Sequence, residues 1–189
     1  MTATISPDTF VRVTDHIPDI QVDLRYATDD NFTGHTIYSF RDAWLRYGTV
    51  CKLKKAQEIL SAQGLSLLIW DAFRPAAAQF KLWEVYPCDG FVANPEKGFS
   101  PHTRGHTVDV TLADREGNLL EMPSAFDDFS SRANRDYSDA TPTAARNALL
   151  MERTMADCGF RPYSEEWWHF VDTDDYPVEK DFLPGEKER

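Results

Sequence analysis

Residues 107–118, which read TVDVTLADREGN, are the stretch of sequence that decides the fold class. Val108, Val110 and Leu112 alternate with polar residues in its first half, the period of two that is typical of a strand with one apolar face. Asp109 then lies on the opposite, polar face. Residues 114–118 (DREGN) favour a hairpin turn. A strand that turns back on itself pairs antiparallel, so this stretch predicts an antiparallel sheet.

Three helices are predicted from apolar spacing and from signals at their ends. Apolar residues recur at helical spacing over residues 50–60, and Gly64 follows where a left-handed cap is placed. Pro75 stands in position to begin a second helix. A third helix is predicted to begin at the Thr-Pro pair of residues 141–142 and to end at Gly159.

Further strands are predicted before and after these helices. Residues 65–70 (LSLLIW) form a short apolar run of strand length that leads into Arg74 at a strand-to-helix corner. Apolar and polar residues alternate over residues 20–26, which predicts a strand. A last strand is predicted over residues 167–171. Helices and strands do not alternate strictly, so we expect an α+β fold with helices packed on a mainly antiparallel sheet. A doubly wound parallel sheet is the weaker alternative.

Length and charge restrict the domain organisation and the partners. The chain has 189 residues and contains no repeat, low-complexity tract or Gly/Ser linker, so residues 1–189 are expected to form a single domain. Its 20 Lys and Arg residues against 31 Asp and Glu residues give a formal charge of −11. Because this charge repels a phosphate backbone, no nucleic-acid partner is expected.

Apolar runs and cysteines bear on the cellular location. No run approaches the roughly 18 apolar residues that cross a bilayer, so no membrane partner is expected. The first ten residues lack the basic start and apolar stretch of a secretory signal. Three cysteines, at positions 51, 88 and 158, form no CxxC pair and are interpreted as buried free thiols. These features favour the cytoplasm.

Two histidine clusters flanked by carboxylates are the candidate chemical groups. Residues 100–109 (SPHTRGHTVD) carry His102 and Asp109, and residues 165–169 (EEWWH) carry Glu166 and His169. A catalytic zinc ion takes three ligands of these types and leaves one position for water, and the remaining Glu would then act as the base. Spacing alone leaves a purely structural role open for all of these groups.

Other residues near the clusters have more than one interpretation. His106 lies four residues after His102, but Gly105 and the following strand argue against a helical pair of ligands, so we interpret His106 as a non-ligand. Arg74 is a candidate to stabilise a tetrahedral intermediate, although pairing with Asp71 or capping a helix would also explain it.

The second cluster raises a geometric difficulty. Glu166 and His169 are separated by an odd number of residues, so a regular strand would direct them to opposite faces, and a bulge or a late strand start is required. Of Trp167 and Trp168, one is expected in the core and the other in the wall of the site.

The complete pattern resembles a known superfamily. Ser100-x-His102-x-x-Gly105-x-x-x-Asp109, followed by Glu166-x-Trp168-His169, is similar to the signature of zinc D-Ala-D-Ala metallopeptidases, which also include DD-carboxypeptidases. Residues 23–34 (DLRYATDDNFTG), 71–75 (DAFRP) and 126–127 (FD) resemble segments of the vancomycin-resistance (VanX) type of D-alanyl-D-alanine dipeptidase. The resemblance therefore spans nearly the whole chain.

The resemblance implies a hedgehog/DD-peptidase-like fold and a hydrolase that cleaves D-alanyl-D-alanine. One zinc ion per chain is implied on His102, Asp109 and His169. Glu166 is implied as the general base, and Arg74 as the group that stabilises the transition state.

A dipeptide substrate presents an ammonium group and a carboxylate, and the site needs partners for both. Asp127 is the candidate for the ammonium group. Ser100 and Tyr26 are candidates for the other end or for the carbonyl oxygen. The expected partner is thus a small dipeptide, and the sequence specifies no oligomeric state.

Three alternatives remain from the sequence. A DD-carboxypeptidase or endopeptidase of the same fold would act on cell-wall stems from an open cleft. A non-catalytic, zinc-bound binding module, as in hedgehog signalling domains, would keep the fold, although the presence of Glu166 and Arg74 argues against it. A cysteine hydrolase is the weakest alternative because no nucleophile motif surrounds a cysteine.

Overall fold

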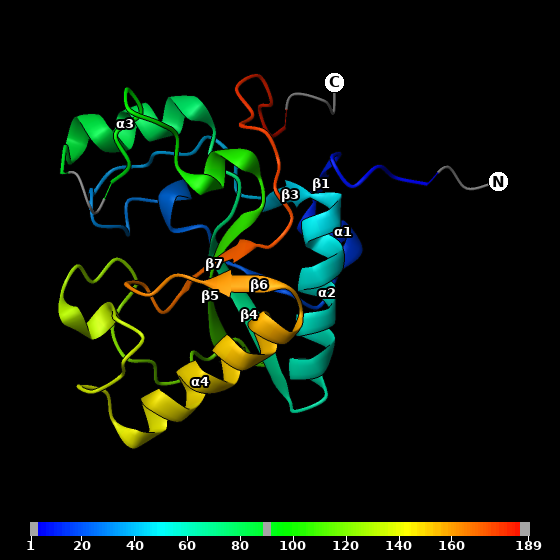
Figure 1. Ribbon diagram of the computed structural model, residues 1–189, viewed down its shortest axis with the longest axis vertical. Helices are drawn as coiled ribbons and strands as arrows, with labels where there is room; N and C mark the ends of the chain where they lie inside the picture. Colours follow the sequence, from blue (N-terminus) through cyan, green and yellow to red (C-terminus); the bar gives the residue numbers. More distant parts are fainter. Residues whose placement is uncertain (1–3, 89–91, 186–189) are drawn as a thin grey trace.

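The computed structural model describes residues 4–88 and 92–185 as two sheets with helices around them (Figure 1). The larger sheet has five strands in the order β2-β4-β5-β7-β6. Its strands are β2 (Gln21–Val22), β4 (Leu65–Asp71), β5 (Thr107–Asp114), β6 (Phe160–Pro162) and β7 (His169–Asp172). The smaller sheet pairs β1 (Phe10–Arg12) with β3 (Trp44–Arg46).

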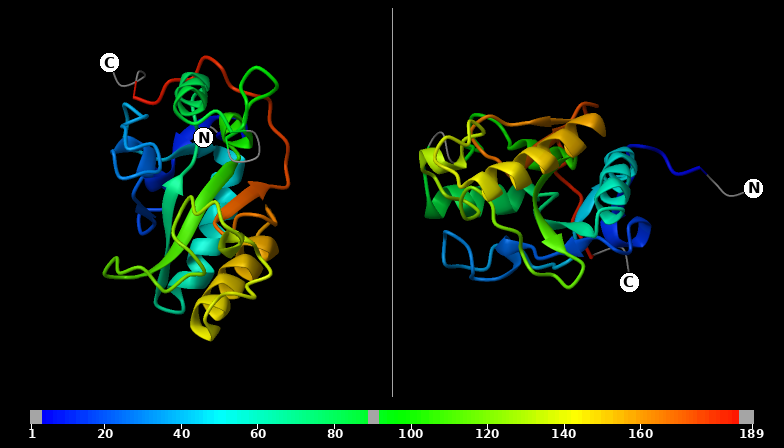
Figure 2. Two further views of the ribbon diagram at one scale, coloured as in Figure 1. Left: turned by 90° about the vertical axis from the view of Figure 1, so that its left-hand side faces the viewer. Right: turned by 90° about the horizontal axis from the view of Figure 1, so that it is seen from below.

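Two long helices pack side by side against the larger sheet (Figure 2). They are α2 (Tyr47–Ser61), which packs on β4, and α4 (Pro142–Asp157), which packs on β5 and β6. The remaining helical elements are α1 (Val13–His16), α3 (Ala76–Val85) and the 3-10 turns η1 (Arg25–Ala27), η2 (Pro101–Arg104) and η3 (Ser131–Ala133). No helix within the described ranges has the length and apolarity needed to cross a bilayer.

The predicted α+β class and mainly antiparallel sheet are confirmed. β4–β5, β5–β7 and β6–β7 pair antiparallel, while β2 pairs parallel with β4, so the sheet is mixed at one edge. The predicted turn after β5 is present, with the Asp114 amide donating to the Asn118 carbonyl at 2.9 Å. Only an isolated bridge from Ala113 to Leu119 follows it, so the hairpin is shorter than the sequence suggested.

The predicted strand over residues 20–26 is wrong in its second half. β2 ends at Val22, the Asp23 amide donates to the Ile69 carbonyl, and the chain then turns into η1. Leu24 and Tyr26 are buried in that turn, so their alternation with polar residues reflects burial and not an extended backbone. The turn brings Tyr26 toward the cavity described below.

The helix signals in the sequence are confirmed. Pro75 is the N-terminal cap residue of α3. The Thr141 hydroxyl accepts a hydrogen bond from the Ala144 amide at 3.1 Å and caps α4. Gly64 and Gly159 follow α2 and α4 with positive φ angles of 79° and 94°, a backbone conformation that glycine adopts without strain.

The central strand β5 is buried on both faces. Val108, Val110 and Leu112 are completely buried and belong to the apolar core. Asp109 projects from the other face because side chains alternate along a strand. The apolar side of β5 therefore fixes the strand in the core and directs one carboxylate to the opposite side.

The cysteine prediction is confirmed in one respect and wrong in another. No disulfide joins the three cysteines, but Cys51 is exposed, and Cys88 and Cys158 are half-buried. Cys51 lies on the outer side of α2, beside Val50, whose side chain is buried in the core. Helical spacing therefore places this thiol in solvent.

Gly105 connects η2 to β5 with φ at 76°, and a Cβ atom there would lie 2.3 Å from the Phe10 ring. We expect Gly105→Ala to lower the free energy of unfolding by about 3 kcal/mol, from backbone strain plus overpacking. Gly64→Ala is the matched control, since its φ is 79° and no atom lies within 4 Å. Gly64→Ala should lower the free energy of unfolding, measured with urea, by only about 1 kcal/mol. Equal losses would contradict the packing argument.

His106 is buried behind the sheet and faces Tyr176, with ring centroids 6.0 Å apart. Its Nδ1 lies 3.1 Å from the Thr107 hydroxyl. Burial lowers the pKa of His106 to about 4, and the nearby Asp172 carboxylate only partly opposes this shift.

This depressed pKa predicts a pH dependence of stability. The unfolded chain takes up a proton below about pH 6.5, whereas folded His106 resists protonation until about pH 4. The contribution of neutral His106 to the free energy of unfolding is therefore complete above pH 6.5 and is lost as the pH falls toward 4. We expect His106→Gln to weaken the decline of unfolding free energy across this window, measured with a chelator present.

His35→Gln, in an exposed loop, is the control for loss of a histidine as such. An unchanged decline in the His106→Gln variant would contradict the assignment.

Candidate metal centre and active-site cavity

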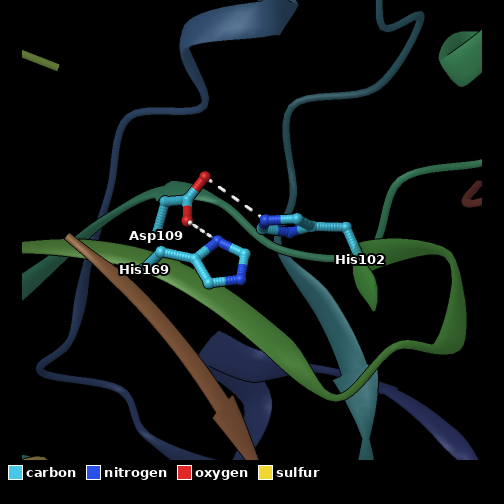
Figure 3. A group of neighbouring side chains, drawn as sticks. All are labelled: His102, Asp109 and His169. Carbon is cyan, nitrogen blue, oxygen red and sulfur yellow. Dashed lines mark hydrogen bonds and ion pairs between the residues drawn. The ribbon is translucent and has the colours of Figure 1, made fainter. Parts of the chain in front are cut away.

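Three buried side chains converge from η2, β5 and β7 (Figure 3). His102, Asp109 and His169 each offer one ligand atom, and these atoms lie within 4.8 Å of one another. His102 Nε2 lies 3.3 Å from Asp109 Oδ2, and His169 Nδ1 lies 3.0 Å from Asp109 Oδ1. No other group of this kind is found among the described residues. The cluster can hold a metal ion.

Backbone pairing places two of these groups opposite each other. Asp109 and His169 are direct partners in the antiparallel β5–β7 register, so their side chains project from the same face. β7 begins at His169, and Glu166 lies in the preceding turn, where its carbonyl accepts from the His169 amide at 3.2 Å. Of the two arrangements that the sequence left open, a bulge or a late strand start, the structure has the late start, so the strand predicted over residues 167–171 begins two residues later than predicted.

His102 is oriented by the turn that carries it. The Ser100 hydroxyl accepts from the His102 amide at 3.3 Å and caps η2. His102 Nδ1 lies 2.8 Å from the Ala72 carbonyl oxygen, which can accept only if that nitrogen carries the proton. Nε2 then presents its lone pair toward Asp109, the arrangement found for metal-ligating histidines.

The charges within the cluster reinforce one another. Burial opposes charge on Asp109, yet His102 and His169 outweigh it and hold the pKa of this carboxyl well below its usual range. Burial likewise lowers the pKa of His102, but Asp109 and Asp71 raise it above its ordinary value overall. A metal cation at this position would likewise stabilise the ionised Asp109 carboxylate.

Glu166 stands beside the cluster in a different environment. Its Oε2 lies 3.5 Å from His169 Nδ1. Burial raises the pKa of Glu166 to about 7, against the opposing effect of His169. A carboxyl with a pKa near neutrality can both accept and return a proton.

Arg74 is buried and held by three side chains. Asp71 Oδ2 accepts from its Nε at 3.2 Å and from its Nη2 at 2.6 Å, and Gln79 Oε1 accepts from Nη1 at 3.0 Å. Its guanidinium carbon lies 5.3 Å from the centre of the Tyr26 ring. Burial disfavours the charged form, but Asp71 keeps the pKa of Arg74 above its ordinary value. Arg74 thus pairs with Asp71 and also lies at the site.

A cavity of about 370 Å³ opens onto the cluster. Every residue that the sequence singled out for the site lines this cavity: Tyr26, Arg74, Ser100, His102, Asp109, Asp127, Glu166 and His169. His106 does not line it, and Trp168 does while Trp167 does not. Trp167 instead donates to the Ser124 hydroxyl at 2.9 Å, so the predicted division of the two tryptophans is confirmed.

Asp127 and Tyr26 form a pair in the cavity wall. The Tyr26 hydroxyl donates to Asp127 Oδ2 at 2.9 Å. Burial raises the pKa of Asp127 well above its usual value, and Asp109 adds to this effect. A cationic group entering the cavity would stabilise the ionised form of this carboxyl.

Sequence reasoning missed several residues of the cavity and its support. Gln79 links Arg74 to the cavity wall, since it donates to the Ala93 carbonyl at 2.7 Å. Phe32 and Phe129 also line the cavity. Gln79 lies one turn into the predicted helix after Pro75, a position that could have been examined. The two phenylalanines lie in loops and leave no local signal.

Comparison with known proteins assigns the family. A family model described as D-ala-D-ala dipeptidase matches residues 7–187. A D-alanyl-D-alanine dipeptidase of Escherichia coli (strain K12) is 39% identical over 153 residues, which cover 81% of this chain and 79% of that protein. One from Enterococcus faecium is 32% identical over 179 residues, covering 84% and 89%.

Among solved structures, a zinc-bound mutant of the vancomycin-resistance D,D-pentapeptidase VanY has a TM-score of 0.47 and 14% identity, covering 70% of this chain and 74% of that one. The family model and the two relatives span most of the chain, and the chain belongs to the D-ala-D-ala dipeptidase family.

Proposed function

We propose that this protein hydrolyses free D-alanyl-D-alanine to two D-alanine molecules with one zinc ion per chain. The observation that carries the proposal is the convergence of three possible metal ligands, a half-buried glutamate and a buried arginine on one cavity. Family membership supports the same substrate, since the relatives bear the name D-alanyl-D-alanine dipeptidase.

The donor set fits zinc. Two imidazole nitrogens and one carboxylate oxygen are ligands of the types used in catalytic zinc sites, which keep a further position for water or substrate. His102, Asp109 and His169 would hold the ion. When bound, zinc polarises a carbonyl group and lowers the pKa of a water molecule.

Glu166 is the general base in this proposal. Its place beside His169, with a pKa of about 7, suits a carboxylate that takes a proton from the attacking water and passes it to the leaving amine. Glu165, the adjacent residue, is exposed and does not line the cavity. The chain thus offers two neighbouring glutamates of which only one faces the site.

Arg74 stabilises the negative charge that develops on the carbonyl oxygen. Asp71 and Gln79 fix its guanidinium before substrate arrives, so little reorganisation is needed in the transition state. Asp127 receives the substrate ammonium group, with Tyr26 orienting its carboxylate. Ser100, which lines the cavity, is assigned to the other end of the dipeptide or its carbonyl.

The proposed location is the cytoplasm, where a free dipeptide is available and thiols stay reduced. No disulfide joins any two of the three cysteines.

The first test is release of D-alanine from D-Ala-D-Ala by the zinc-loaded protein. We expect turnover of the dipeptide and none of a stem peptide that ends in D-Ala-D-Ala. Cleavage of the stem peptide instead would indicate a carboxypeptidase. Bound zinc with turnover of neither substrate would indicate a binding module.

Glu166→Gln should lower kcat by about 100- to 10,000-fold, because proton transfer to and from the reacting groups is lost. Its zinc content should equal that of the wild type. Glu165→Gln is the matched control and should stay within about threefold of wild-type activity. Similar losses in both variants would remove Glu166 from the role of base.

His169→Ala should weaken zinc binding by more than about 100-fold, measured by competition with a chromophoric chelator. His106→Gln is the control, since His106 belongs to the same sequence motif as His102 but lies outside the cluster. Comparable loss of zinc in the two variants would contradict the ligand assignment.

A further inference from the structure

Three aromatic side chains from separate segments meet beside the cavity. Phe32 follows η1, Tyr86 follows α3, and Phe129 precedes η3. The ring centroids are 5.2 Å apart for Phe32 and Phe129, and 5.7 Å apart for both Phe32–Tyr86 and Tyr86–Phe129. Each ring therefore contacts the other two, and we call this group the aromatic cluster. Its three segments lie on the left side of Figure 1.

The aromatic cluster adjoins the proposed ammonium site. Phe32 and Phe129 both line the cavity with Asp127. The Phe32 ring meets the Tyr26 ring edge to face at 6.2 Å, and the Tyr26 hydroxyl donates to Asp127. Asp127 is also only two residues before Phe129 in the chain. The cluster thus stands next to the carboxylate assigned to the amino end of the substrate.

The outer side of the aromatic cluster faces solvent. Tyr86 is 38% exposed and does not line the cavity, while Phe32 and Phe129 are half-buried. The aromatic cluster therefore extends from the lining of the cavity to the exposed surface. Removal of the two phenylalanine rings would widen the cavity toward this surface.

A longer peptide needs the space that the aromatic cluster fills. In a free dipeptide the chain ends at the ammonium group, beside Asp127. A peptide with one more residue has an amide there and continues by about 3.5 Å. Each ring is held by contacts to two others, so moving one ring aside breaks both of its contacts.

Resting on the proposed function, we propose that Phe32 and Phe129, supported by Tyr86, close the amino side of the cavity and determine that dipeptides are accepted and amino-extended peptides are rejected. Asp127 selects for charge at this end, and the aromatic cluster selects for length. The two selections come from different side chains and are separable by mutation.

The test compares D-Ala-D-Ala with the tripeptide Gly-D-Ala-D-Ala, which keeps an ammonium group one residue further out. In the double variant Phe32→Ala/Phe129→Ala, we expect the ratio of kcat/KM for the tripeptide to that for the dipeptide to rise at least about tenfold. Tyr86→Ala should also raise this ratio, but by less, because the substitution removes only the ring that supports Phe32 and Phe129. Binding of the tripeptide is measured in parallel by calorimetry in a Glu166→Gln background.

Phe80→Ala is the matched control. Phe80 is an exposed aromatic residue of α3 and lies outside the cavity. It should leave the ratio unchanged. If the double variant is unfolded by circular dichroism, Tyr86→Ala and Phe32→Leu decide the question, since both keep more of the packing.

The outcomes separate this inference from the proposed function. If wild-type protein does not cleave D-Ala-D-Ala, the proposed function fails, and the length selection fails with it. If the wild type cleaves the dipeptide and the ratio in folded cluster variants stays within twofold of wild type, the length selection is overturned and the dipeptidase assignment stands. Loss of dipeptide affinity without gain of tripeptide binding would likewise overturn it.

Discussion

The site depends on one buried carboxylate shared by two imidazoles. Asp109 accepts from His169 across the β5–β7 register and stands 3.3 Å from His102 of η2. A buried carboxylate without partners would cost several kcal/mol, so the burial of β5 requires this convergence. A shift of the register by one residue would turn Asp109 toward the apolar core and separate it from both histidines.

Irregular segments hold the other functional groups around this carboxylate. The corner after β4 makes two hydrogen bonds with His102. The Ala72 carbonyl oxygen accepts from His102 Nδ1, and the Arg74 amide donates to the His102 carbonyl at 3.2 Å. Arg74 is fixed in turn by Asp71 and Gln79. One corner therefore positions both a proposed metal ligand and the cation that is proposed to stabilise the transition state. Hydrogen bonds of the backbone give these segments the rigidity that a site needs.

Neighbouring carboxyl groups acquire different properties from their surroundings. The two histidines hold the pKa of Asp109 low, whereas burial raises the pKa of Glu166 to about 7. The first suits a permanently charged ligand and the second a group that exchanges protons. Burial also raises the pKa of Asp127, which lines the same cavity and is proposed to bind the substrate ammonium group. All three side chains carry the same carboxyl group, so their different proposed roles follow from their different surroundings.

The sequence by itself determined the elements whose signals are local. Capping by Thr141, the proline at residue 75 and the glycines after α2 and α4 predicted the helix ends. The spacing of residues 100–109 and 165–169, with the family resemblance, predicted which side chains form the cluster that can hold a metal ion. Only the tertiary structure decided that β2 is short and parallel to β4, that β7 begins late, and that Phe32, Tyr86 and Phe129 meet. Local patterns record burial and backbone preference, but partners far apart in sequence are chosen by packing.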